Sequence, residues 1–236
     1  MPRKKLGSLP SAMLWLTVLC AAAVGWFYWS FPETILRYRL TADFRVDGKL
    51  VSGTGVWQVK YQPRICSDHC TTRAKLTGDA IPIELGPKRG TLWILLRQRN
   101  DARDYQFELR TKPEWIVPYL FGHSPFSPPS FPKYVRGLRE IHGTVHPTLK
   151  QLPQMVILPN DELPTKYQWV GTGPGGVDLG PLPEFVGASI TVTDEPPTTG
   201  IRTRLSWLDV KLRPVFALSR SESDGLVIQD FEEIHP

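Results

Sequence analysis

Alternating apolar and polar residues on either side of Asp47-Gly48 constrain the fold of this chain more than any other feature. From Leu36 to Val46 every second residue is apolar, and most of the residues between them are charged. A period of two places the apolar side chains on one face of a β-strand. Asp-Gly supplies the two positive-φ positions of a tight hairpin turn, and 49–61 alternate again. The sequence therefore predicts a long β-hairpin with one buried face.

Shorter runs of β-type residues between turn residues predict the remaining strands. These runs cover 73–78, 81–85, 91–96, 140–145, 154–158, 188–193 and 202–207. We therefore expect a mainly β fold, with one β-rich domain at 33–215 that is built as a sandwich or a barrel with long loops. The acidic, loosely patterned residues 216–236 predict a frayed C-terminal tail.

The first 31 residues predict a membrane anchor. Arg3, Lys4 and Lys5 precede an almost unbroken apolar run at 12–31, whose uncharged part would rise about 27 Å as a helix. The alternatives are a cleaved signal peptide and a lipoprotein site at Cys20, and the length of the run favours the uncleaved anchor. The positive-inside rule then places 1–11 in the cytoplasm. A single transmembrane helix would hold an exported, periplasmic domain to the inner membrane.

The net charge of +5 gives no reason to expect a nucleic-acid partner. Three basic residues and no acidic residue lie within 1–31, so the rest of the chain carries 25 basic and 23 acidic side chains. A nearly balanced charge of interspersed sign is not typical of a nucleic-acid-binding surface.

Prolines and aromatic residues dominate the segment 113–134, which holds six of each. Prolines at this density predict an extended, semi-rigid excursion from the sheet and no continuous helix. Large aromatic side chains on a stiff segment lose little entropy when they dock on a partner. The candidate partner-binding residues are Trp115, Tyr119, Phe121, Phe126 and Phe131. The alternative is that these rings fold back and cover a face of the sheet.

Cys66 and Cys70 flank the sharpest local cluster, which also contains His69. In an oxidising compartment the two thiols would form a short-loop disulfide. Free thiols and a metal site are the alternatives, but a closed zinc site needs four ligands and no second cysteine pair is present. We expect a disulfide and no metal.

Sequence motifs nominate no catalytic residue and no cofactor. His142 and His146 lie in a strand-like segment, which would hold them about 13 Å apart and prevent them from sharing an ion. The glycine-rich stretch 171–176 lacks the Gly-Lys-Ser/Thr ending of a phosphate loop and predicts a surface loop. Asp194 and Glu195 are adjacent, so in a strand they would point to opposite faces.

Three blocks of the sequence resemble a family of uncharacterised proteobacterial single-pass envelope proteins. They are RYRLT at 37–41 with SGTGV at 52–56, GDAIPIEL at 78–85 with RGTL at 89–92, and ITVTDEP at 190–196 with GI at 200–201 and RLSWL at 204–208. The resemblance spans most of 37–208 and implies a shared, exported β-rich domain. It implies no catalytic residue, because the family has no assigned function. The segment 113–134 and the details of the anchor lie outside these blocks.

Two functional classes remain. The first is a membrane-anchored binding or scaffolding module, whose exported domain docks on a protein partner in the envelope. The second is an envelope hydrolase with an unrecognised site, for which His142, His146 and Asp194 are the first candidates. The anchor and the absent motifs favour the binding module, because function has to be argued from a site.

Overall fold

A computed structural model describes residues 9–30, 33–63, 72–98, 111–123, 134, 137–161, 166–170, 181–205 and 208. In chain order, the elements are α1 (Leu9–Ser30), β1 (Thr34–Val46), β2 (Lys49–Pro63), β3 (Thr72–Thr77), β4 (Ile81–Gly86), β5 (Gly90–Ile94), α3 (Pro113–Leu120), β6 (Thr144–Val145), the 3-10 helix η1 (Leu149–Gln151), β7 (Met155–Leu158), β8 (Gln168–Val170), β9 (Glu184–Val192) and α5 (Ile201–Arg204).

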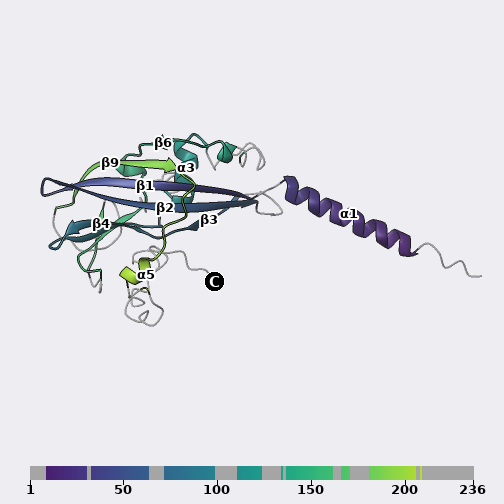
Figure 1. Ribbon diagram of the computed structural model, residues 1–236, viewed down its shortest axis with the longest axis horizontal. Coiled ribbons are helices and arrows are strands. Elements are labelled where there is room, and N and C mark those ends of the chain that lie inside the picture. The colour runs from purple at the N-terminus through teal and green to yellow at the C-terminus, as the bar shows by residue number, and fades with distance from the viewer. Residues whose placement is uncertain are drawn as a thin grey trace, which may run out of the picture.

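The predicted hairpin is confirmed over its full length. β1 pairs with β2 antiparallel from Thr34 opposite Tyr61 to Val46 opposite Lys49. The turn residues Asp47 and Gly48 have φ of 50° and 78°. Along β1, every second residue from Thr34 to Val46 is buried, as the alternation predicts. Figure 1 shows this hairpin running the length of the β-structure.

Two antiparallel sheets enclose one apolar core. The first has the order β3-β2-β1-β9-β6 and the second β4-β5-β7-β8. Inward side chains of both sheets form this core, with Tyr38, Trp57 and Phe44 among the largest fully buried residues. The mainly β fold is therefore confirmed, whereas β8 was not predicted and β6 is shorter than the expected strand at 140–145.

A second, smaller core covers the outer face of the second sheet. Trp93, Val156 and Trp169 point away from the main core and pack against apolar residues of the C-terminal segment. That segment forms helix α5 where a strand at 202–207 was predicted, so this prediction is wrong. The helix arises because Ile201, Leu205 and Leu208 follow a helical spacing and are all buried on the sheet. The Asp79 carboxylate accepts a hydrogen bond from the Ile201 N–H (2.9 Å) and fixes the first turn.

Helix α3 corrects the prediction of an extended segment at its beginning. Pro113 occupies the first helical turn, where its missing N–H costs nothing. Pro118 lies inside the helix and cannot donate to the carbonyl of Glu114. The Tyr61 hydroxyl donates to that carbonyl instead (2.6 Å), and the Tyr38 hydroxyl donates to the carbonyl of Pro113 (2.6 Å). The Tyr61 hydroxyl thus replaces the backbone donor that Pro118 lacks, and the Tyr38 hydroxyl adds a second hydrogen bond between the hairpin and the helix.

Burial keeps the hydroxyls of Tyr38 and Tyr61 protonated, so that both can donate a hydrogen bond. It raises the pKa of Tyr38 and of Tyr61 well above the usual value, with Glu114 as a further cause. Tyr134 is also buried, and its pKa is raised by that burial. Unlike the other two, its hydroxyl has no hydrogen-bond partner among the described residues.

Replacing Tyr61 by phenylalanine should lower the free energy of unfolding by about 2 kcal/mol, because the Glu114 carbonyl of α3 loses the hydroxyl that replaces its helical donor. Chemical denaturation of the full chain measures this difference. Tyr134→Phe is the matched control: it removes a buried hydroxyl that bonds to no described residue, so it should leave stability unchanged or raise it. Equal losses in both variants would contradict the role given to Tyr61.

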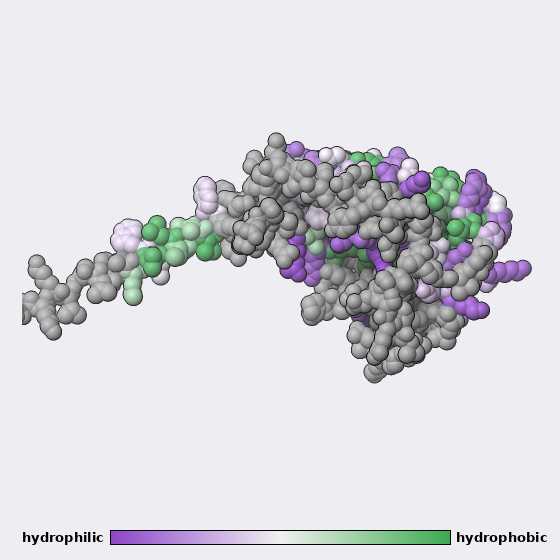
Figure 2. All heavy atoms as spheres, turned by 180° about the vertical axis from the view of Figure 1, so that it is seen from behind, coloured by the Kyte–Doolittle hydropathy of each residue, from purple (hydrophilic) through white to green (hydrophobic). Residues whose placement is uncertain are grey.

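Helix α1 corrects the prediction of a membrane anchor. Its described side chains, 13–26, are all exposed, and Figure 2 shows apolar residues along this stretch. Within the part of the chain that the structure describes, no helix is both long enough and apolar enough to cross a membrane. The predicted transmembrane helix at 12–31, the signal-anchor topology and the inner-membrane and periplasmic location are therefore corrected.

The predicted disulfide falls on residues that the structure does not describe. Cys66 and Cys70 lie outside the described residues, and within them no cysteine pair lies at disulfide distance. Cys20 is free and exposed.

Candidate functional site

Paired polar side chains cover the outer face of the first sheet. Most outward residues of β1 have a cross-strand or nearby partner of matching chemistry. These pairs are Arg39 with Glu195, Thr41 with Thr54 (2.9 Å), Asp43 with Ser52 (2.5 Å) and Arg45 with Glu184 (2.8 Å). Because the charges compensate one another, this face resembles an ordinary solvated surface.

Arg37 is the exception in this row. Its Nε donates to Gln58 Oε1 (2.7 Å) and its Nη1 to the main-chain oxygen of Asp194 (3.1 Å). Both acceptors are neutral, so the guanidinium charge is not paired with a carboxylate among the described residues. Two hydrogen bonds nevertheless fix its direction.

A hollow of about 380 Å³ opens beside Arg37, where β1 begins and β9 ends, and we call it the arginine hollow. It is lined by Ile35, Leu36, Arg37, Leu138, Arg139, Ile141, His142, Val192, Thr193 and Asp194. Leu36, Leu138 and Ile141 are buried and form an apolar floor. The polar side chains of the hollow surround this floor.

Arg139 brings a second guanidinium to the hollow. Its Nε donates to Thr34 Oγ1 (3.2 Å) and its Nη2 to the main-chain oxygen of Glu33 (3.3 Å). The Glu33 carboxylate does not pair with Arg139. It forms an ion pair with Lys60 (2.6 Å) and accepts a hydrogen bond from Gln62. These hydrogen bonds hold the pKa of the Glu33 carboxyl below its usual value. Arg139, like Arg37, therefore meets only neutral acceptors within the described part of the chain.

The hollow brings together two of the three residues predicted as hydrolase candidates. His142 and Asp194 both line it, although they are far apart in the sequence. His146 does not: its Nδ1 lies 3.2 Å from the main-chain oxygen of Ala188. His142 forms no hydrogen bond with any described residue, and the Thr193 hydroxyl accepts the N–H of Glu195 (3.3 Å). In the described part of this hollow, no hydroxyl therefore lies in hydrogen-bonding contact with His142 or Asp194.

The predicted partner-binding aromatics are only partly described. Trp115, Tyr119 and Phe121 are half-buried, and the first and third pack against the main core. The Trp115 ring lies 5.5 Å from that of Tyr61, which also holds α3 in place. Phe126 and Phe131 lie outside the described residues, as does the glycine-rich stretch 171–176. Binding of a partner through this set of residues stays a prediction.

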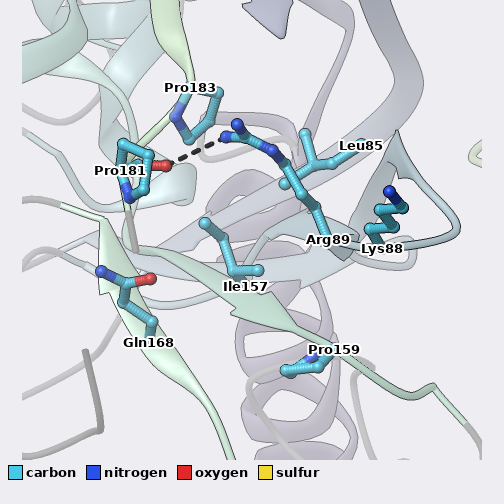
Figure 3. A pocket seen from close by; sticks show the side chains of 8 residues that line it. All are labelled: Leu85, Lys88, Arg89, Ile157, Pro159, Gln168, Pro181 and Pro183. Atoms are coloured by element: carbon cyan, nitrogen blue, oxygen red, sulfur yellow. Dashed lines mark hydrogen bonds between the residues drawn. The ribbon is translucent and has the colours of Figure 1, made fainter. Parts of the chain in front are cut away.

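A second hollow, of about 360 Å³, lies near the turn of the β1–β2 hairpin (Figure 3), and we call it the proline hollow. It is lined by Leu85, Lys88, Arg89, Ile157, Pro159, Gln168, Pro181 and Pro183. Arg89 Nη2 contacts Asp47 Oδ1 (2.7 Å), and its Nη1 donates to the main-chain oxygen of Pro181 (3.2 Å). The two hollows are therefore built at opposite ends of β1. Neither contains a metal-ligand cluster: no three His, Cys, Asp or Glu side chains gather suitably in the described ranges.

Sequence reasoning missed both arginines of the first hollow. The alternation correctly placed Arg37 on the outer face of the hairpin, but its neighbours from 138–142 and 192–194 come from distant parts of the chain. The sequence signal was only that three outward residues of β1 are arginines. Which of them has a carboxylate partner depends on distant residues: Arg39 and Arg45 have one and Arg37 has none among the described residues.

No protein-family model, no curated protein and no solved structure matches this chain. The resemblance to proteobacterial envelope proteins therefore stays a prediction, and the function has to be argued from the two hollows themselves.

Proposed function

We propose that this protein is a binding module, and that the arginine hollow receives an acidic side chain from a protein partner. The observation that carries the proposal is the pair of guanidiniums, Arg37 and Arg139, which lie in one hollow without a carboxylate partner among the described residues. Asp194 supplies the only carboxylate of the described lining. The hollow therefore carries an excess of positive charge.

Guanidinium groups suit a carboxylate because their planar N–H donors match its two oxygens. Arg37 and Arg139 are already oriented by Gln58, Thr34 and main-chain oxygens, so docking costs them little side-chain entropy. The apolar floor of Leu36, Leu138 and Ile141 can take an apolar side chain next to the acidic one. This combination favours a short acidic and apolar peptide segment over a free inorganic anion.

The hydrolase alternative has less support. A general base must lie within hydrogen-bonding reach of the group that it activates, or reach it through one water. His142 shares the hollow with Asp194 but is bonded to no described residue. A binding role uses the arginines that are held in place, whereas a hydrolytic role would need partners for His142 that the described residues do not supply.

The double variant Arg37→Gln with Arg139→Gln should weaken binding of an acidic peptide at least tenfold, because two charge-assisted contacts are lost at about 1.5 kcal/mol or more each. The probe is a fluorescein-labelled hexapeptide of alternating glutamate and leucine, titrated with the full chain and followed by fluorescence anisotropy. The same peptide with glutamine in place of glutamate should bind the unmodified protein at least tenfold more weakly.

The double variant Arg39→Gln with Arg45→Gln is the matched control. It removes two positive charges from the same face of β1, but from arginines that already have carboxylate partners. We expect it to change the dissociation constant less than threefold, since such charges contribute little. Equal weakening by both double variants would show non-specific attraction and contradict the proposal. Failure of the unmodified protein to prefer the glutamate peptide would contradict it as well.

A further inference from the structure

The proline hollow is independent of the arginine hollow and has a different composition. It lies where the second sheet meets the turn of the hairpin, and three of its eight lining residues are prolines. Pro159 follows β7, while Pro181 and Pro183 precede β9. Figure 3 shows Pro181 and Pro183 on one side of the hollow and Pro159 on another, with Ile157 between them.

The walls of this hollow are fixed without a ligand. Arg89 joins three segments: its own turn between β4 and β5, the hairpin turn through Asp47, and the segment before β9 through the carbonyl of Pro181. Proline rings also have a fixed φ, so the walls keep little conformational freedom. A preformed hollow binds a small molecule at a lower cost than one that must be ordered.

The charge at the hollow favours one negative group. Asp47 compensates Arg89, whereas Lys88 is exposed and forms no ion pair or hydrogen bond with the described residues. No described carboxylate lines the hollow. Leu85 and Ile157 provide apolar surface in the same lining, and Gln168 is the one neutral polar side chain of the described lining.

The size and the walls limit the rest of the ligand. A volume of about 360 Å³ lies near the lower end of the range of small-molecule pockets, about 300–1,000 Å³, which suits a compact ring system. Proline rings are apolar surfaces that pack against aromatic rings, as when proline-rich segments dock in aromatic-lined grooves. We propose that the proline hollow is a binding site for a small aromatic carboxylate, whose ring lies between the prolines and whose carboxylate faces Lys88.

The test uses the full chain and two probes, 2-naphthoate and the neutral 2-naphthylmethanol, in calorimetric titrations. We expect saturable one-to-one binding of 2-naphthoate, and a dissociation constant about fivefold higher for the neutral probe, as one solvent-exposed ion pair would give. Lys88→Gln should remove this preference and leave the affinity for 2-naphthylmethanol unchanged. Because Lys88 lies in an exposed turn, the variant should fold normally.

Lys49→Gln is the matched control, since Lys49 is an exposed lysine at the start of β2 that does not line the hollow. It should leave both affinities unchanged. The proposal is overturned if 2-naphthoate shows no saturable binding, if the preference for the carboxylate survives Lys88→Gln, or if Lys49→Gln weakens binding equally. Loss of 2-naphthoate binding in the Arg37→Gln, Arg139→Gln variant alone would place the probe in the arginine hollow and likewise overturn it.

Discussion

Replacing Gly90 by alanine should lower the free energy of unfolding by at least about 3 kcal/mol, because the new methyl group has no room. Gly90 begins β5 with a φ of +77°, a conformation that side chains disfavour. A Cβ at this position would lie 2.5 Å from the Cα of Pro159 and 2.8 Å from the carbonyl carbon of Leu158, and closer still to the carbonyl oxygen of Leu158. These are backbone atoms of the neighbouring strand region, so β5 would have to move away from β7.

Gly86→Ala separates the two causes of this effect. Gly86 lies at the other end of the same turn, with a φ of +96°, but a Cβ there would meet no atom within 4 Å. Only the backbone preference should be lost, at about 1 kcal/mol. Urea denaturation of the three proteins measures both differences. A loss for Gly90→Ala no larger than that for Gly86→Ala would mean that β5 and β7 are not as close as described.

Replacing Asp161 by alanine should cost about 3 kcal/mol, because its carboxylate is the shared acceptor of several partly buried donors. Arg204 donates to Asp161 Oδ2 through Nε (3.0 Å) and Nη2 (2.7 Å). Thr91 Oγ1 lies 2.9 Å from the same oxygen, and Trp93 Nε1 donates to Oδ1 (3.0 Å). Removal of the carboxylate would leave the Arg204 guanidinium, which lies next to the second core, without its main partner.

Arg204 cannot avoid this cost by losing its proton, because a guanidinium stays protonated in proteins. In the unmodified protein, burial acts to lower the pKa of this guanidinium, but hydrogen bonds with Asp161 and Glu84 outweigh that effect and raise it. Its charge also lies over the Trp93 ring, 5.0 Å from the ring centre. The Asp161 contacts therefore attach the C-terminal helix α5 to the outer face of the second sheet.

Glu84→Gln is the control for Asp161→Ala. Glu84 also pairs with Arg204, but two thirds of its side chain is exposed, whereas the Asp161 side chain is 18% exposed. An exposed ion pair contributes less than about 1 kcal/mol, so Glu84→Gln should change stability only slightly. Thermal unfolding and tryptophan fluorescence report on the attachment of α5 near Trp93 and Trp169. If the two variants lost equal stability, the shared-acceptor role of Asp161 would be wrong.

Sequence patterns predicted those parts of the fold that are determined by residues close together in the chain. The hairpin could be predicted because its turn and its alternation lie in one continuous stretch, and the observed register agrees with both. Helix α3 could not be predicted, because the hydroxyl that replaces the missing N–H of Pro118 comes from Tyr61, more than 50 residues earlier, and the Tyr38 hydroxyl also bonds to this helix. Helix α5 was missed because its short apolar pattern is stabilised only by packing against Trp93 and Trp169.

The candidate site was predicted less well than the fold. His142 and Asp194 were named from the sequence as candidates and do share a hollow. The arginines that give this hollow its charge were not named, because nothing near Arg37 or Arg139 in the sequence distinguishes a paired guanidinium from an unpaired one. That distinction depends on which distant residues the sheet topology places beside each arginine.

The position of β1 in the middle of the first sheet has a consequence for biosynthesis. One neighbour, β2, follows directly in the chain, while on the other side Leu40 pairs with Ile190, 150 residues later. The hairpin can form as soon as it leaves the ribosome, but the other edge of β1 stays unpaired until β9 has been translated. An unpaired edge with one apolar face is a template for association with other chains. The nascent protein therefore passes through a long interval in which it needs shielding, and its folding rate should be limited by this distant pairing.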